Sequence, residues 1–226
     1  MDMRISGSGV ITAGEYEGIR ISGSARMTGV VHCESLRVAG SLSGETVECR
    51  NDMRISGGSR FSANVKANDL RVAGSLSCGA LKCVSLVVAG VTSVGGDVEA
   101  ENVKVDGALA CEGLLNAEEI EIKFEKGMTI GSIGGSKIVI MSKHRMDKKI
   151  RLPLFHSISN QIDKGGVHVK NTVEGDEIAL EGVRAESVSG RTVAIGDGCE
   201  IGLVRYSETI EISPNAKVGE VEKIDF

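Results

Sequence analysis

The four histidines are the residues best suited to acid–base chemistry near neutral pH, because the imidazole pKa lies close to neutrality. They are His32, His144, His156 and His168, and their spacing does not bring them together. Two of them fall in an irregular segment. His32 is predicted to lie in an outward column of the repeat described below, with Glu15, Cys49, Lys66, Lys82 and Glu99. A lone outward histidine is more often solvated than catalytic, so we expect no catalytic residue and no enzyme activity.

Six cysteines could act as nucleophiles or metal ligands: Cys33, Cys49, Cys78, Cys83, Cys111 and Cys199. The chain has no CxxC pair, so we expect no metal, no cofactor and reduced thiols. Cys78 and Cys111 fall in an inward column, and Cys33 and Cys83 share a column with alanines. Cys49 alone is predicted to point outward, where an exposed thiol is a weak indication of reactivity.

Composition argues against several other classes of function. The 226 residues carry a net charge of -5 and only 3% aromatic residues, which is unfavourable for binding nucleic acid. The glycine phrases end strands instead of opening helices, so no nucleotide site and no small-molecule substrate are predicted. The start MDMRISGSG has no apolar signal core and no stretch is long enough to span a membrane, so we expect a cytoplasmic location.

A short phrase recurs at intervals of 16 or 17 residues: MRISG at 3, IRISG at 19, LRVAG at 36, MRISG at 53, LRVAG at 70, LVVAG at 86 and VKVDG at 103. Weaker copies follow as IEI at 120 and IVI at 138. Apolar and polar residues alternate within each phrase, which is typical of a half-buried strand, and a glycine closes most copies. A repeat of this length is too short for a strand and a crossover helix, but it suits short strands coiled about one axis. We therefore predict an all-β fold, a parallel β-helix of about nine coils over residues 1–140.

Stacking the copies predicts columns of residues along the axis. One inward column reads Ile11, Met27, Gly44, Phe61, Cys78, Val94, Cys111 and Met128. A second reads Val31, Val65, Leu81, Val98 and Leu115, interrupted by Glu48.

An outward column holds Arg4, Arg20, Arg37, Arg54 and Arg71, with Asp2, Asp52 and Asp69 two residues before three of them. A solvated charged face is the simpler interpretation, and a stripe that binds polyanions is the alternative.

The periodicity stops after Ile140, and residues 141–166 form an irregular, basic and amphipathic excursion. Its sharper interpretation is a contact with an anionic membrane or a partner through Lys143, Arg145, Lys148, Lys149, Arg151, Leu154 and Phe155. The simpler interpretation is a loop packed against the solenoid.

Further coils are predicted over residues 167–226, from EIALEGV at 177, TVAIGDGCEIG at 192 and TIEISPNAKVG at 209. These coils either continue the first stack or form a smaller second one.

The chain also resembles a known family. The RVxG and RISG coils, GLLNAEEIEI at 113–122, IGSIGG at 130–135 and the closing segments from VEGDEIALEGV to SPNAKVGEV are similar to the bactofilins, bacterial polymer-forming cytoskeletal proteins, in a long Bacillus-type form. The resemblance implies a right-handed parallel β-helix that polymerises end to end without nucleotide and acts in cell shape or motility. Its implied partners are further copies of itself, the inner membrane surface and other cell-envelope or motility proteins.

Open solenoid ends would provide the polymer contacts, because unpaired strand edges and bare apolar side chains favour further strand addition. We expect this interface to involve Met3, Ile5, Val10 and Ile11 at one end and Val218, Val221, Ile224 and Phe226 at the other. Two alternatives remain: a hexapeptide-repeat acyltransferase, which would be a left-handed trimer with 18 residues per coil, and a scaffold solenoid that does not polymerise.

Overall fold

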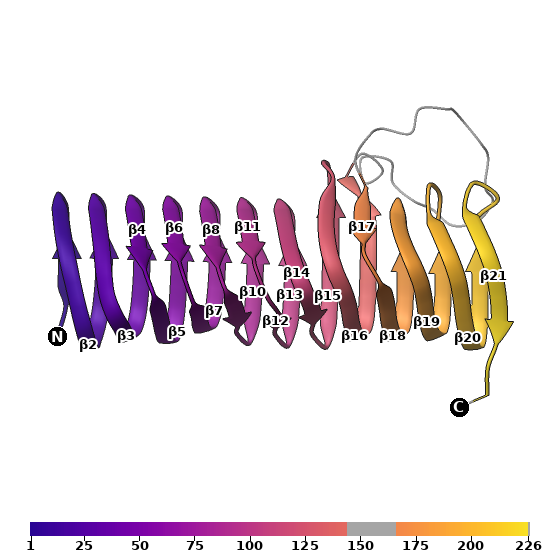
Figure 1. The fold of residues 1–226 in the computed structure, drawn as a ribbon, viewed down its shortest axis with the longest axis horizontal. Helices are drawn as coiled ribbons and strands as arrows, with labels where there is room; N and C mark the ends of the chain where they lie inside the picture. Colours follow the sequence, from indigo (N-terminus) through magenta and orange to yellow (C-terminus); the bar gives the residue numbers. More distant parts are fainter. Residues whose placement is uncertain (144–165, 226) are drawn as a thin grey trace.

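The computed structural model describes residues 1–143 and 166–225. These residues form a parallel β-solenoid of about 12 turns with no helix (Figure 1). The prediction of an all-β parallel β-helix is confirmed.

The strands before the excursion are β1 (Met3–Ile5), β2 (Ser8–Ile21), β3 (Ser24–Val38), β4 (Ser41–Gly44), β5 (Thr46–Ile55), β6 (Gly58–Phe61), β7 (Asn64–Val72), β8 (Ser75–Cys78), β9 (Ala80–Lys82), β10 (Ser85–Val88), β11 (Val91–Val94), β12 (Val98–Glu99), β13 (Asn102–Val105), β14 (Ala108–Asn116), β15 (Glu119–Phe124) and β16 (Met128–Ser142). After it come β17 (Val167–Val169), β18 (Thr172–Leu180), β19 (Val183–Ile195), β20 (Glu200–Ile212) and β21 (Lys217–Lys223).

Each strand pairs in parallel with the equivalent strand of the next coil, so residues one repeat apart lie over one another. Leu36 is opposite Met53, and Met53 is opposite Leu70. All three side chains are fully buried. Each buried aliphatic side chain of this kind contributes roughly 1.5–3 kcal/mol, so the apolar columns are the main source of stability.

Glycine at the corner after each phrase allows successive coils to approach closely. A Cβ atom on Gly57 would lie 2.0 Å from the carbonyl oxygen of Gly40, on the preceding coil. Gly7, on the first coil, would meet no atom within 4 Å. Close contact between coils therefore requires glycine at the corner after each phrase, a set of positions called here the glycine column. Gly7 is the exception, because no coil precedes it in the stack.

Two predicted assignments to the inward columns are wrong. Val47, not Glu48, lies between Val31 and Val65 in the second inward column. The strand register shifts between Cys49 and Asp52, where this coil holds an extra residue before its phrase. Counting a fixed distance back from the phrase therefore selected the wrong neighbour.

The second error is at the far end of the first inward column. Ile130, not Met128, is opposite Cys111, because the segment from Ile122 to Ile130 is two residues longer than the segment from Val105 to Cys111 on the preceding coil. Met128 is buried, but it lies opposite Val167.

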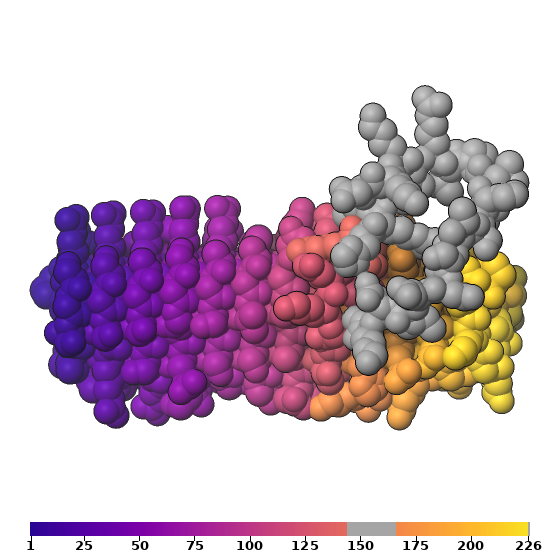
Figure 2. All heavy atoms as spheres, turned by 90° about the horizontal axis from the view of Figure 1, so that it is seen from above, coloured from indigo at the N-terminus to yellow at the C-terminus, as the bar shows by residue number. Residues whose placement is uncertain are grey.

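The strands on either side of the excursion belong to one stack. β16 pairs with β17 and with β18, and Ile140 lies opposite Leu180. Of the two arrangements considered for residues 167–226, the structure has the continuation. The first and last coils lie at opposite ends of a straight rod (Figures 1 and 2).

Candidate functional site

The N-terminal coil leaves one strand edge open within the described residues. β1 pairs with the Ile19–Ile21 part of β2 on one side only. Met3 and Ile5 are partly buried against the core. Val10 is 61% exposed but lies in the outward column with Arg26, so it belongs to the side of the rod.

Ile11 is 0% exposed, and this burial does not support the prediction that it contributes to an end contact. Tyr16 lies in an inward column, opposite Cys33, and packs against the core. Its hydroxyl donates to the carbonyl oxygen of Thr12 at 2.9 Å. This tyrosine partly shields the N-terminal end of the core, and the sequence analysis had identified no such cap.

The C-terminal coil is more open. Ile212 is 41% exposed and Val221 is 47% exposed, while Val218 is partly buried against the core. β21 pairs with β20 on one side, and the amide of Ile224 donates to the carbonyl oxygen of Tyr206 at 2.8 Å. Phe226 lies outside the described residues. Ile210 and Ile212 were not predicted as residues of the end contact, although TIEI at 209 repeats the alternation of the earlier phrases.

The two ends carry the same apolar column. It passes from Ile5 through one residue on every coil to Ile212, and its members are Ile5, Ile21, Val38, Ile55, Val72, Val88, Val105, Ile122, Ile140, Leu180, Ile195 and Ile212. Ile5 in the first coil and Ile212 in the last coil thus occupy the same position of the repeat. Each presents partly uncovered aliphatic side chains beside an open strand edge.

The arginine ladder, defined as Arg4, Arg20, Arg37, Arg54 and Arg71, occupies one outward column over five consecutive coils. Asp52 lies 3.6 Å from Arg37 and 3.2 Å from Arg54 (carboxylate oxygen to guanidinium nitrogen). Like charges at this spacing repel by roughly 1 kcal/mol per pair in water. A single carboxylate therefore neutralises only part of the row.

A shallow groove of about 750 Å³ follows a second outward column. The column reads Glu15, His32, Glu48, Lys66, Lys82 and Glu99. His32 Nδ1 lies 3.4 Å from Glu48 Oε2, and Lys82 pairs with Glu99. The prediction that Cys49 belongs to this column is wrong, because Glu48 takes its place.

Cys49 is instead 2% exposed and lies between Cys33 and Ala67 in an inward column. All six cysteines are buried free thiols. Contact with the Cys49 thiol, together with burial, raises the pKa of Cys33. Burial raises the pKa of Cys78 and of Cys83 to about 12. These thiols are protonated near neutral pH, and the predicted exposed thiol is absent from the described residues.

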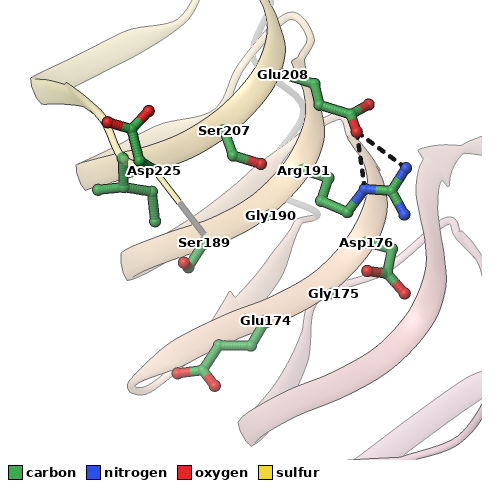
Figure 3. A pocket seen from close by; sticks show the side chains of 10 residues that line it. Glu174, Gly175, Asp176, Ser189, Gly190, Arg191, Ser207, Glu208 and Asp225 are labelled. Atoms are coloured by element: carbon green, nitrogen blue, oxygen red, sulfur yellow. Dashed lines mark hydrogen bonds and ion pairs between the residues drawn. The ribbon is translucent and has the colours of Figure 1, made fainter.

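A second hollow of about 550 Å³ lies on the C-terminal coils (Figure 3). Glu174, Asp176 and Asp225 contribute carboxylates to its lining, and Arg191 points toward Glu208, with its Nε 3.1 Å from Oε1. In residues 1–143 and 166–225 no group of His, Cys, Asp or Glu is arranged to hold a metal ion.

Of the residues predicted to contact a membrane or partner, only Lys143 is described. Its ammonium group lies 3.2 Å from Asp106 Oδ1, on a neighbouring part of the solenoid. Arg145, Lys148, Lys149, Arg151, Leu154 and Phe155 lie outside the described residues. Among the described residues, no helix is long and apolar enough to cross a membrane.

The fold defines a repeat protein of the parallel β-solenoid class, which fits a structural scaffold. The chain is 31% identical over 113 residues to the uncharacterized protein YhbF of Bacillus subtilis, an alignment that covers 50% of this chain and 42% of YhbF. It is 30% identical over 107 residues to the uncharacterized protein YhbE of the same organism, covering 47% and 41%. The chain thus spans less than half the length of the curated relatives it matches. No protein-family model and no solved structure matches it.

Proposed function

We propose that this chain is a structural protein that assembles end to end into filaments without nucleotide, as the bactofilins do, and acts as a scaffold in cell shape or motility. The proposal includes the absence of enzyme activity and a cytoplasmic location, with contact to the inner face of the membrane. Further copies of the same chain are its principal partners.

The observation that carries the proposal is the equivalence of the two terminal coils. Ile5 and Ile212 belong to one column, and each lies beside a strand edge that is unpaired within the described residues. A terminal coil of a second copy would pair these edges and cover the aliphatic side chains, as successive coils do within the rod. Strand addition of this kind combines main-chain hydrogen bonds with apolar burial.

The end contact needs no bound nucleotide. Its parts are backbone amides, backbone carbonyls and aliphatic side chains, which are present in the chain itself. Filament formation should therefore depend on protein concentration and persist without any nucleoside phosphate.

Electron microscopy and sedimentation of the purified protein without nucleotide test the proposal. We expect filaments from the unchanged chain, and short folded oligomers from Ile5→Glu or Ile212→Glu, because a buried carboxylate would be unpaired at the contact. Val91→Glu is the matched control, since Val91 is 55% exposed on the side of the rod, and it should still form filaments.

Filaments of normal length from both end variants would show that these coils are not the contact. An unchanged chain that stays monomeric at high concentration would instead support a scaffold that does not polymerise.

A further inference from the structure

The arginine ladder is unusual within this rod because its charges stack on like charges. In several other outward columns, a cation lies beside an acidic residue on the next coil: Lys82 with Glu99, Lys104 with Glu121, Arg184 with Glu200, Arg191 with Glu208 and Arg205 with Glu222. The ladder departs from this arrangement over five consecutive coils.

Three members of the ladder are unpaired. Arg4, Arg20 and Arg71 have no ion pair or hydrogen bond in residues 1–143 and 166–225. Among the described residues, only Arg37 and Arg54 of the ladder form ion pairs, and they share Asp52. The ladder therefore offers unneutralised guanidinium groups to an external anion.

The surroundings of the ladder leave it accessible. Two residues after each of the last four arginines comes a small side chain: Ser22, Ala39, Ser56 and Ala73. All five arginines are exposed. Paired strands lie about 4.8 Å apart, so the five guanidinium groups form a straight row roughly 19 Å long.

We propose that the arginine ladder binds a linear polyanion, a chain that carries a phosphate or carboxylate on each repeating unit. Such a chain can lie along the row and place one anion beside each guanidinium group. Arginine suits this role because its planar fork matches both phosphate and carboxylate.

A linear partner fits better than a membrane surface. The basic row is one residue wide, Asp2, Asp52 and Asp69 flank it, and the whole chain carries a net charge of -5. A broad anionic surface would face these acidic residues as well, whereas a single chain can follow the row. The residues of the ladder and its flanks include no aromatic side chain, so recognition depends on charge and not on base stacking.

Fluorescence anisotropy with labelled inorganic polyphosphate tests the proposal, with unlabelled polyglutamate as competitor. The test variant is Arg4→Gln/Arg20→Gln/Arg71→Gln. The matched control is Arg184→Gln/Arg191→Gln/Arg205→Gln, which has the same net charge but removes arginines that are paired with glutamates.

We expect the ladder variant to bind polyphosphate at least tenfold more weakly than the control variant. The slope of log affinity against log salt should fall by about 2, since each cation contributes about 0.7 for a flexible polyanion. A second variant, Asp69→Asn, should bind several-fold more tightly, because it removes a flanking carboxylate without removing an arginine. Circular dichroism of each variant verifies that the solenoid is retained.

Displacement of polyphosphate by polyglutamate would show that the ladder also binds polycarboxylates. No displacement would show that the ladder binds only phosphate chains. Equal affinity of the ladder and control variants for polyphosphate would overturn the proposal. So would ladder-dependent binding to vesicles of anionic phospholipid without binding to polyphosphate, which would assign the row to a membrane surface.

Discussion

Ile140 and Leu180 lie directly opposite each other on neighbouring coils, although the 144–165 segment separates them along the chain. Both are buried members of the column that passes through every coil. The solenoid is therefore continuous across the excursion. The excursion leaves at one corner and the chain re-enters the stack at Gly166, whose carbonyl oxygen accepts a hydrogen bond from the amide of Met128 at 3.0 Å.

Deletion of residues 144–165 should leave the solenoid folded. The deletion retains Met141, Ser142, Lys143 and Gly166 between Ile140 and Val167, and the equivalent corner between Ile122 and Met128 is spanned by 123–127. We expect an unchanged β-type circular dichroism spectrum and a melting temperature within a few degrees of the parent. Loss of the cooperative transition would show that the excursion is part of the core.

The glycine column provides a prediction with an internal control. Gly57→Ala should lower the free energy of unfolding by about 2 kcal/mol or more, because its Cβ would lie 2.0 Å from the Gly40 carbonyl oxygen and the coils would have to separate. Gly7→Ala, in the same column, should change it by less than about 1 kcal/mol. Urea denaturation measures both, and equal effects would contradict the close-approach explanation.

Thr92 carries a buried hydroxyl that has no hydrogen-bond partner among the described residues, in a column between Leu76 and Leu109. A buried unsatisfied polar group costs about 1–3 kcal/mol, so Thr92→Val should stabilise the chain by about 1 kcal/mol or more. The measurement is the midpoint of urea denaturation. Thr28→Val is a useful comparison, because the Thr28 hydroxyl donates to the Ile11 carbonyl oxygen and its removal should not stabilise.

The buried thiols predict a loss of stability at alkaline pH. Burial raises the pKa of Cys78 and Cys83 to about 12, and that of Cys111 and Cys199 to about 11. An unfolded thiol ionises near pH 8.5–9, so above that pH the unfolded chain binds fewer protons than the folded chain. The thiol contribution is therefore fully present below about pH 8.5 and is lost as the pH rises toward 11 to 12.

Urea midpoints between pH 8 and pH 10.5 measure this effect. The midpoint should fall across the range, and it should fall less steeply in Cys78→Ala/Cys83→Ala. A double variant with the same pH dependence as the parent would show that other groups, such as lysines, cause the loss.

The sequence by itself determined the architecture of this protein. The recurring phrase specifies parallel stacking, because alternation of apolar and polar residues marks strands and the short repeat leaves no room for a crossover helix. It also placed the arginine ladder in one column, since each of the five arginines is the second residue of a phrase. Residues fixed by the phrase, such as Leu36, Met53 and Leu70, were therefore predicted correctly.

Only the tertiary structure decided what happens between phrases. Corners differ in length from coil to coil, and one extra residue exchanges inward and outward neighbours, which is why Cys49 is buried and Glu48 lines the groove. The joining of β16 to β18 and the covering of the N-terminal end by Tyr16 also depend on contacts between distant residues. Local periodicity carries no information about such contacts, because they are selected by packing across the whole stack.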